Sequence, residues 1–496
     1  MTRRALMVQG TASFAGKSLL VTGLCRMLVR RGLRVVPFKA QNMSLNSGAT
    51  PDGREIGRAQ IVQAEAARLT PHADMNPVLL KPSAAACCQV VMRGSVWGDL
   101  PAAGSARFMA EAWTAIAESY ARLASACDLV IIEGAGCPAE INYLDRDLAN
   151  MRVARLADAP VLLIADMDRG GAFASLYGTW ALLPPEDRGR IRGFIFNKLR
   201  GDAQGLLPGV TRLESETGVP TLGFLPWLPE LWIDEEDGVA LESRRPMAGR
   251  SGQLRVVVLQ FPSIANFTDF APLERDPAFA VSYASGPEPL LSADIVILPG
   301  SKHTAADLGW IRKGRLDQAI RDHCAAGGRL IGICGGYQML GRRLADPDGV
   351  EGPTRETEGL NLLDVETVMG RTKTVSPVTA EPIQGTPLAG LTGLTGYEIH
   401  LGVSRVGAGS RPLLHVRRPD GVEVTDGAAS PDGSVWGTCL HGLFEHPGIR
   451  ARLRQAGTEP LSSQSPPWRD AQYDRLADAI ETHLDLARIL SLAGVK

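Results

Sequence analysis

The stretch Ala5-Leu-Met-Val-Gln-Gly10-Thr-Ala-Ser-Phe-Ala-Gly16-Lys17-Ser18 decides the architecture of the first half of the chain. Its first five residues predict a short buried strand, and the helical pattern of Lys17–Arg31 follows the glycine-rich turn. In this order, backbone N–H groups can curl around phosphate at the positive end of the helix. The stretch therefore predicts a nucleotide-binding phosphate loop, whose expected residues are Gly10, Thr11, Gly16, Lys17 and Ser18.

Two residues at this loop are expected to bind Mg²⁺. In such loops the lysine bridges the outer phosphates and the next hydroxyl ligates the metal, which assigns these roles to Lys17 and Ser18. The pattern Leu129-Val-Ile-Ile-Glu133 predicts a strand that ends in an acid, and ligands bind at the carboxyl ends of parallel strands. Glu133 is therefore the second expected metal ligand. The loop has five residues between its glycines where the usual pattern has four, and this spacing resembles the dethiobiotin synthetase group. The resemblance implies that Asn197 faces the adenine.

Short apolar runs alternate with helical patterns through the first half, which is typical of an α/β domain with a parallel sheet. One of the expected helices is Glu55–Leu69. Asp166 and Asp168 end one of the runs, and there two interpretations stay open: contact with substrate or metal, and simple capping of the loop. The expected strands are Ala5–Gln9, Arg34–Phe38, Gln89–Met92, Leu129–Glu133, Val161–Ala165 and Gly193–Asn197.

A polar stretch marked by Gly and Pro, at 234–252, predicts a domain boundary. We expect one domain at 1–240, a second at 253–448, and a helical tail at 449–496. The second domain repeats the strand–helix pattern and becomes richer in Thr, Val and Gly from about 360 to 436, which favours β-strands. In the tail, the apolar spacing of Asp470–Leu492 predicts an amphipathic helix.

The second domain contains Arg329-Leu-Ile-Gly332-Ile-Cys334-Gly335-Gly336, a strand followed by a cysteine between glycines and then by a helical pattern. This is the cysteine form of a nucleophile elbow. A thiol at a helix N-terminus has a lowered pKa, so Cys334 is the expected nucleophile. The N–H of Gly335 is placed to bind an oxyanion, and the loop that contains Gly300 and Ser301 is expected to supply a second N–H.

A cysteine nucleophile needs a base, and His441 lies at the end of a strand-like run, Val435-Trp-Gly-Thr-Cys-Leu-His. Two other histidines are weaker candidates. The residues around His400 predict a strand beside the site, and His303 is expected in a surface loop.

The elbow, the Leu298-Pro-Gly-Ser-Lys302 loop and the His441 strand together resemble a class I glutamine amidotransferase domain. Most of that class has a glutamate two residues after the histidine, whereas here the position is Leu443. This departure resembles the cobyrinate-amidating subgroup, in which a Cys–His pair acts alone. The hypothesis is therefore a two-member site, with Glu445 a weak candidate for a residue that orients the imidazole.

Further motifs resemble the cobyric acid synthase family: Pro37-Phe-Lys-Ala-Gln41-Asn42-Met43, the helix from Ala59 to Ala67, Leu80-Lys81-Pro82 and Glu133-Gly-Ala-Gly-Cys-Pro-Ala-Glu140. The resemblance implies an ATP-dependent amidoligase at 1–240 and a class I glutamine amidotransferase at 253–448. It also implies amidation of carboxylates b, d, e and g of adenosylcobyrinic a,c-diamide, with ATP, Mg²⁺, glutamine and the corrinoid as ligands. Gln41 and Asn42 are the expected substrate contacts, together with Asp166 and Asp168.

Three alternatives remain. The sister diamide synthase would carry an acidic loop where this chain has Gln41-Asn42-Met43. A nucleotide-dependent switch with an inert second domain would not need the intact cysteine and histidine. A peptidoglycan-amidating relative usually has its amidotransferase on a separate chain.

Composition restricts the partners. The net charge of −2 over 496 residues gives no reason to expect nucleic acid or an anionic membrane. No run approaches the roughly 20 apolar residues of a membrane helix. The eight cysteines show no metal or disulfide spacing, and we expect a cytoplasmic protein without a signal segment. The sequence does not predict an oligomeric state.

Overall fold

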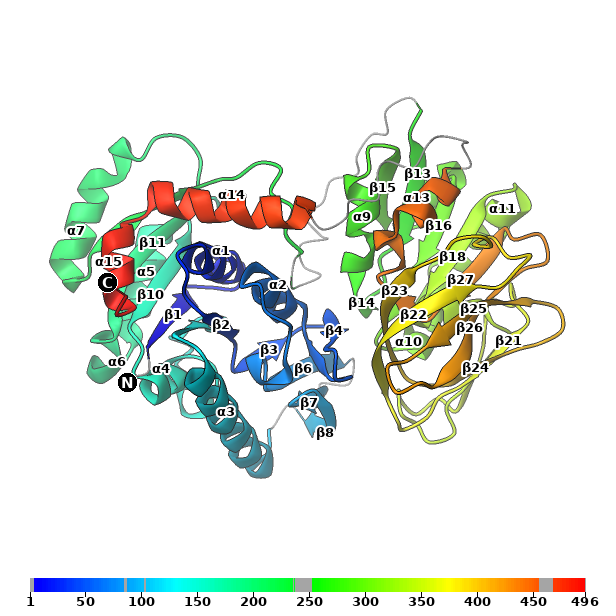
Figure 1. The fold of residues 1–496 in the computed structure, drawn as a ribbon, viewed down its shortest axis with the longest axis horizontal. Coiled ribbons are helices and arrows are strands. Elements are labelled where there is room, and N and C mark those ends of the chain that lie inside the picture. The colour runs from blue at the N-terminus through cyan, green and yellow to red at the C-terminus, as the bar shows by residue number, and fades with distance from the viewer. Residues whose placement is uncertain are drawn as a thin grey trace.

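The computed structural model describes residues 4–83, 87–101, 104–234, 236, 252–454 and 467–495. Figure 1 shows two α/β lobes side by side, the first in blue to green and the second in green to orange. The fold class expected from the sequence, a phosphate-loop domain of parallel-sheet type followed by an amidotransferase-type α/β domain, is confirmed by the two sheets.

The first domain is built on a six-stranded parallel sheet in the order β12-β11-β10-β1-β9-β2. Alternate residues of β1 point to opposite faces, so Leu6 packs towards α1 and Met7 towards α3. Both faces are covered by helices, as a parallel sheet requires. The strands are β1 Ala5–Gly10, β2 Val35–Phe38, β9 Leu129–Glu133, β10 Val161–Asp166, β11 Ile191–Leu199 and β12 Thr221–Pro226. The helices are α1 Lys17–Arg30, α2 Arg58–Ala66, α3 Ala106–Ala126, α4 Met151–Ala157, α5 Ala172–Leu182, α6 Pro185–Arg188 and α7 Leu207–Thr217.

Two expectations for this domain were wrong in detail. The run at Gln89–Met92 belongs to β7 (Cys87–Met92), which lies outside the parallel sheet. It is part of a four-stranded sheet of order β3-β6-β7-β8, in which β3 is Gln41–Met43. Its partners β6 (Val78–Ser83) and β8 (Ser95–Pro101) run antiparallel to it, because connections of three and two residues are too short for a crossover helix. The predicted helix at Glu55–Leu69 begins only at Arg58, since Glu55–Gly57 forms β5 and pairs with β4 (Ser47–Ala49).

The second domain has a ten-stranded sheet in the order β15-β13-β16-β18-β27-β26-β25-β22-β23-β28. Its first half is parallel and its second half is antiparallel, which agrees with the change in composition near 360. The strands are β13 Leu254–Leu259, β15 Phe279–Ala284, β16 Ile295–Leu298, β18 Arg329–Ile333, β22 Thr374–Pro382, β23 Leu394–His400, β25 Arg411–Arg417, β26 Glu423–Ala429, β27 Val435–Thr438 and β28 Leu440–His441. The helices are α9 Ala271–Arg275, α10 Thr304–Lys313, α11 Leu316–Ala325, α12 Gly335–Leu340 and α13 Pro447–Leu453.

The tail returns to the first domain. It forms two helices, α14 (Pro467–His483) and α15 (Leu486–Leu492), where one was expected, and Figure 1 shows α14 lying along α1. Arg26 of α1 is 1% exposed and pairs with Asp474 at 2.8 Å. Gly23 lets the helices approach closely, because a Cβ there would lie 2.4 Å from Ile480 Cδ1.

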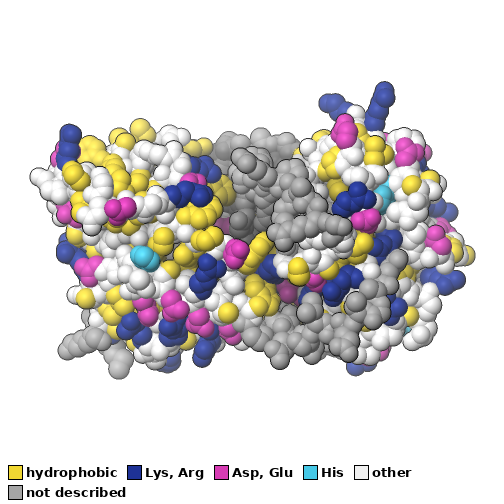
Figure 2. Space-filling model, turned by 90° about the horizontal axis from the view of Figure 1, so that it is seen from above, with side chains coloured by type: hydrophobic (Ala, Val, Ile, Leu, Met, Phe, Trp, Pro, Cys, Tyr) yellow, Lys and Arg dark blue, Asp and Glu magenta, His cyan; other side chains and the backbone are white. Residues whose placement is uncertain are grey.

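On the face seen in Figure 2, acidic and basic side chains are interspersed over both lobes. In the described part of the chain, no helix is long and apolar enough to cross a bilayer.

The close contact between α1 and α14 gives a matched test. We expect Gly23→Ala to destabilise the first domain by about 1–3 kcal/mol, because the new methyl group overpacks Ile480 and Leu476. Gly178→Ala in α5, where a Cβ would meet nothing within 4 Å, should instead stabilise it by about 0.5–1 kcal/mol. Denaturant unfolding of both variants measures the difference, and equal effects would contradict the packing of the two helices.

Candidate functional sites

The phosphate loop joins β1 to α1 in the expected way. Gly16 has φ 105°, and a Cβ there would lie 2.0 Å from the amide nitrogen of Asn197, so the position requires glycine. The ammonium of Lys17 donates to the carbonyl oxygens of Ala12 at 3.0 Å and Gly136 at 3.1 Å. Burial and the nearby charge of Lys39 lower the pKa of Lys17. A bound phosphate would place negative charge beside Lys17 and Lys39 and so stabilise their charged forms. The charges at the loop therefore favour binding of an anion.

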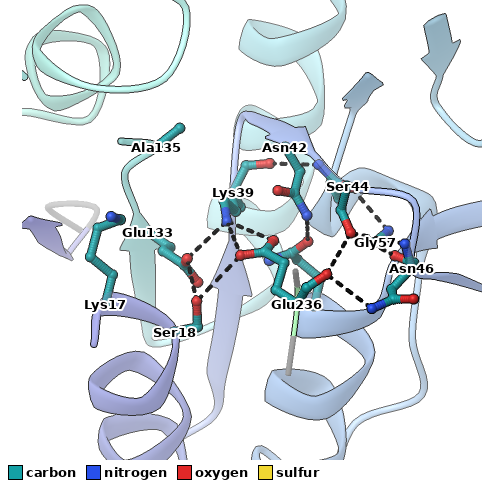
Figure 3. A network of polar contacts seen from close by, with 12 residues as sticks. Lys17, Ser18, Lys39, Asn42, Ser44, Asn46, Gly57, Glu133, Ala135 and Glu236 are labelled. Carbon is teal, nitrogen blue, oxygen red and sulfur yellow. Dashed lines mark hydrogen bonds and ion pairs between the residues drawn. The ribbon is translucent and has the colours of Figure 1, made fainter. Parts of the chain in front are cut away.

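The structure brings Ser18 and Glu133 together. Figure 3 shows the Ser18 hydroxyl beside the Glu133 carboxylate, to which it donates at 2.8 Å. The ammonium of Lys39 binds the same carboxylate at 2.9 Å and also binds Glu236 at 2.8 Å. Burial opposes the charge of Glu133, but Lys39 outweighs it and holds the pKa of that carboxyl below its usual range.

This arrangement fits Mg²⁺. The ion usually takes one or two protein oxygens and completes its shell with phosphate and water oxygens. Ser18 and Glu133 offer such oxygens, and Lys39 shows that a positive charge is stable at this carboxylate. Within the described ranges, no cluster of three or more His, Cys, Asp or Glu side chains could hold a metal by itself. The remaining ligands of a bound ion would be phosphate and water oxygens.

The other expected residues of this domain lie around the same sheet edge. Asn197 donates to the carbonyl of Ala15 at 2.9 Å, and its contact with adenine stays a prediction. Asp166 pairs with Lys198 at 2.7 Å and Asp168 pairs with Arg200 at 2.6 Å, which favours the capping interpretation in this state.

Gln41 and Asn42 lie on β3 (Gln41–Met43); the Asn42 amide donates to Gln60 at 3.2 Å. Their substrate contacts stay predictions. Thr11 is half-buried in the loop, and its N–H donates to the carbonyl of Ile164 at 3.0 Å.

Cys334 sits on a strained turn between β18 and α12. Its φ of 51° and ψ of −111° are unusual for a residue with a side chain, and such strain persists where the surrounding structure enforces it. The strand neighbour Thr438 holds the turn, because its carbonyl accepts from the N–H of Cys334 at 2.8 Å. A Cβ on Gly335 would lie 2.8 Å from the Ser301 nitrogen, so the two candidate oxyanion N–H groups are adjacent. The Gly300 backbone passes close to the His441 ring.

The structure corrects the two-member hypothesis. Nδ1 of His441 bonds Oδ2 of Asp269 at 2.7 Å, and the other carboxylate oxygen accepts from the N–H of Gly442 at 3.0 Å. Asp269 lies on the short 3₁₀ helix η4 (Phe267–Phe270) and is 6% exposed. Because Nδ1 is occupied, Nε2 is the ring nitrogen left for the thiol. Cys334, His441 and Asp269 thus have the geometry of a nucleophile, a base and an orienting acid.

Electrostatics support this arrangement. Burial disfavours a charged imidazole, but Asp269 and Cys334 outweigh burial and raise the pKa of His441 to about 10. Burial likewise disfavours a thiolate, but His441 outweighs it and lowers the pKa of Cys334. The thiol therefore loses its proton at a lower pH than an ordinary cysteine while the imidazole keeps its own. The site favours a thiolate–imidazolium pair at neutral pH.

The remaining acids and histidines have other partners. Glu445 binds Arg469 of the tail and not His441, so its weak candidacy was wrong. His400 lies on β23 as expected and contacts Glu398 at 3.3 Å. His303 was expected at the surface but is only 7% exposed and precedes α10. Sequence reasoning missed Asp269 because it lies 172 residues from His441 without any spacing motif.

The cavity at Cys334 has walls from both domains. His441, Gly300, Ser301 and Gln338 line it from the second domain, and Lys81 lines it from the first. Lys81 and Lys373, which also faces this cavity, both bind the buried carboxylate of Glu55, at 2.6 and 2.5 Å. The thiol thus opens towards the domain that contains the phosphate loop.

Comparisons with known proteins agree with the two domains. Residues 6–241 match the CobQ/CobB/MinD/ParA nucleotide binding domain, and residues 255–448 match the CobB/CobQ-like glutamine amidotransferase domain. A cobyric acid synthase of Sorangium cellulosum is 48% identical, with 100% of this chain and 99% of the relative covered. The chain belongs to the cobyric acid synthase family. Another member, from Syntrophobacter fumaroxidans, is 44% identical, with 99% of each chain covered.

The contact between Asp269 and His441 can be tested with a matched pair. Asp269→Asn should lower glutamine hydrolysis by about 10²- to 10⁴-fold, because the amide no longer fixes the tautomer or stabilises the imidazolium. Glu445→Gln removes a carboxylate that binds Arg469 and not His441, and should change the rate by less than about tenfold. Glutamate release at saturating glutamine measures both. Near-normal hydrolysis by Asp269→Asn would restore the two-member hypothesis.

Proposed function

We propose that the protein amidates carboxylates b, d, e and g of adenosylcobyrinic acid a,c-diamide to give adenosylcobyric acid, using ATP and glutamine. Membership of the cobyric acid synthase family supports this reaction. The observation that carries it is a cavity in which the ligase-domain residue Lys81 and the thiol of Cys334 face the same space. In this proposal residues 1–240 are the amidoligase domain, 253–448 the amidotransferase domain and 449–496 the helical tail. The protein works in the cytoplasm on small molecules.

The ligase domain activates the carboxylate. A carboxylate oxygen attacks the γ-phosphorus of ATP, the bond to ADP breaks, and an acyl phosphate forms. Lys17 and the N–H groups of the loop from Gly10 to Ser18 stabilise charge on the transferred phosphoryl group. Ser18 and Glu133 would hold Mg²⁺, which supplies positive charge to the phosphates when bound. Asn197 would contact the adenine, and Gln41, Asn42, Asp166 and Asp168 would contact the corrinoid. The two aspartates must first exchange their lysine and arginine partners.

The amidotransferase domain releases ammonia. The Cys334 thiolate attacks the side-chain amide carbon of glutamine, while N–H groups at Gly300, Ser301 and Gly335 stabilise the oxyanion. The His441 imidazolium gives its proton to the leaving nitrogen, so ammonia departs and a thioester remains. Water, deprotonated by His441, then hydrolyses the thioester to glutamate.

Ammonia must reach the acyl phosphate unprotonated. Lys81, Lys302 and Lys373 line the cavity where it is released. A protonated lysine disfavours a nearby ammonium ion and does not repel neutral ammonia. Ammonia then attacks the acyl carbon, phosphate leaves, and a proton is lost from the new amide.

Separation of the two activities tests the assignment of Cys334. Cys334→Ala should abolish amidation from glutamine, because no thioester can form. Amidation from added ammonium at high pH should stay within about twofold of the wild type, since the phosphate loop is unchanged. Product mass after incubation with ATP and the diamide measures both. A folded variant that loses both activities would contradict the assignment.

Lys17 tests the phosphate loop. Lys17→Ala removes a cation at the transferred phosphoryl group, where such contacts are worth on the order of 3 kcal/mol. We expect amidation to fall by about 10²-fold or more with either nitrogen source. Glutamine hydrolysis alone, measured without ATP, serves as the control for folding. Normal ammonium-dependent rates in this variant would show that the loop does not act in the reaction.

A further inference from the structure

A loop of the first domain reaches into the second domain beside the Cys334 site. Asn46 is 2% exposed, and its Oδ1 accepts from the backbone N–H of Phe267 at 3.2 Å. The next residue, Ser47, donates its N–H to Oδ1 of Asn266 at 2.9 Å. Two consecutive residues of the ligase domain thus bind two consecutive residues of the amidotransferase domain.

Those two residues begin the turn that carries Asp269. Asn266 has φ 52°, in the left-handed region, and immediately precedes η4. Its carbonyl accepts from the N–H of Asp269 at 3.0 Å. A 3₁₀ turn of this length has few hydrogen bonds of its own, so its position depends on contacts with neighbours. Asn46 and Ser47 supply such contacts, and the Asp269 carboxylate follows within one turn.

The same loop also contacts the side chain that covers a face of the imidazole ring. The Tyr397 ring stacks on the His441 ring, with centroids 5.2 Å apart and planes inclined by 14°. The Tyr397 hydroxyl donates to the carbonyl oxygen of Ser47 at 3.4 Å. Asp269 and Tyr397, the two side chains that hold the His441 ring, therefore both depend on contacts with Asn46 and Ser47.

The orientation of Asn46 is fixed from its other side. Its Nδ2 donates to the carbonyl of Glu236 at 3.1 Å, and the Ser44 hydroxyl donates to the same carbonyl at 2.7 Å. Figure 3 shows this carbonyl between Ser44 and Asn46, with the Glu236 carboxylate turned to Lys39. Because the amide nitrogen is committed to Glu236, the amide oxygen must face Phe267.

We propose that Asn46 and Asn266 are positioning residues of the glutamine-hydrolysing site, through which the ligase domain holds Asp269 and so the imidazole that pairs with Cys334. The inference rests on the proposed hydrolysis of glutamine and not on the identity of the acceptor carboxylates. It differs from simple adhesion between domains, because adhesion would affect stability without changing the ionisation of the thiol.

Paired substitutions separate these possibilities. Asn266→Gly keeps the left-handed backbone but removes the side-chain acceptor for the Ser47 N–H. Asn266→Asp keeps the left-handed backbone and also keeps that acceptor. Asn46→Leu removes the acceptor for Phe267 at similar volume, and Asn46→Asp keeps that acceptor but loses the donor to the Glu236 carbonyl. The first measurement is kcat/KM for glutamine hydrolysis. The second is the pH dependence of Cys334 alkylation by iodoacetamide, followed on its own peptide by mass spectrometry.

We expect Asn266→Gly and Asn46→Leu to lower kcat/KM for glutamine by about tenfold or more. Their alkylation profiles should move to higher pH, as in Asp269→Asn, because a less stable imidazolium raises the pKa of the paired thiol. Asn266→Asp should recover most of the activity and the wild-type profile. Asn46→Asp should lie between Asn46→Leu and the wild type, because its second carboxylate oxygen cannot donate to the Glu236 carbonyl. Ammonium-driven amidation should change little in Asn266→Gly, since the phosphate loop is intact.

Arg469→Gln is the control for a loosened interface, because Arg469 binds Glu65 of the first domain and Glu445 of the second without touching Asp269. A wild-type alkylation profile in both Asn266→Gly and Asn46→Leu would overturn the proposal. So would an equal shift in Arg469→Gln, or failure of Asn266→Asp to recover. A wild-type protein that never releases glutamate would refute the proposed function instead, and the alkylation profiles would still decide the role of the two asparagines.

Discussion

The relative placement of the two domains depends on one buried carboxylate, that of Glu55. It is 1% exposed and is shared between Lys81 of its own domain and Lys373 of the other. Burial alone would raise the pKa of Glu55, but Lys373 and Lys81 outweigh burial and hold it below its usual range. Loss of one partner from such a buried cluster typically costs about 3–5 kcal/mol, because a charge is left unpaired. Separation of the domains would therefore be unfavourable at this point.

Several features of both sites follow from that placement. The Ser47 hydroxyl donates to the same Glu55 carboxylate at 2.7 Å, so the cluster also fixes the loop that contacts Asn266 and Tyr397. Lys81 and Lys373 become walls of the Cys334 cavity. Burial lowers the pKa of Lys373 to about 7, and the nearby Glu55 carboxylate offsets only part of this effect. The ion cluster, the loop and the thiol form one continuous region of structure, although the chain supplies them from segments far apart.

Features encoded by neighbouring residues could be predicted from the sequence. The phosphate loop and the elbow at Cys334 are each a strand, a turn that needs glycine, and a helix. The turn at Gly16 illustrates why, since its φ of 105° and the amide of Asn197 both exclude a side chain. The start of α2 was misplaced for the opposite reason. Glu55–Gly57 has a helical pattern in the sequence, but it is extended because Glu55 must reach Lys81 and Lys373. Tertiary contacts overrode local preference there.

The error about the third member of the Cys–His site has a general physical cause. Leu443 occupies the position where a glutamate is usual, and the sequence hypothesis took the absence of that acid from its motif as its absence from the site. The chemistry requires only an acceptor at Nδ1 of His441, from whichever element comes within hydrogen-bond distance. Asp269 meets the requirement from η4, and its carboxylate also binds the N–H of Gly442, the residue after the histidine. Position 443, which no longer has to supply the acid, is apolar. Leu443 is 2% exposed and packs in the core with Phe270 and Phe444. An acid at 443 would be buried among these side chains, so leucine there is the consequence of an acid that arrives from elsewhere.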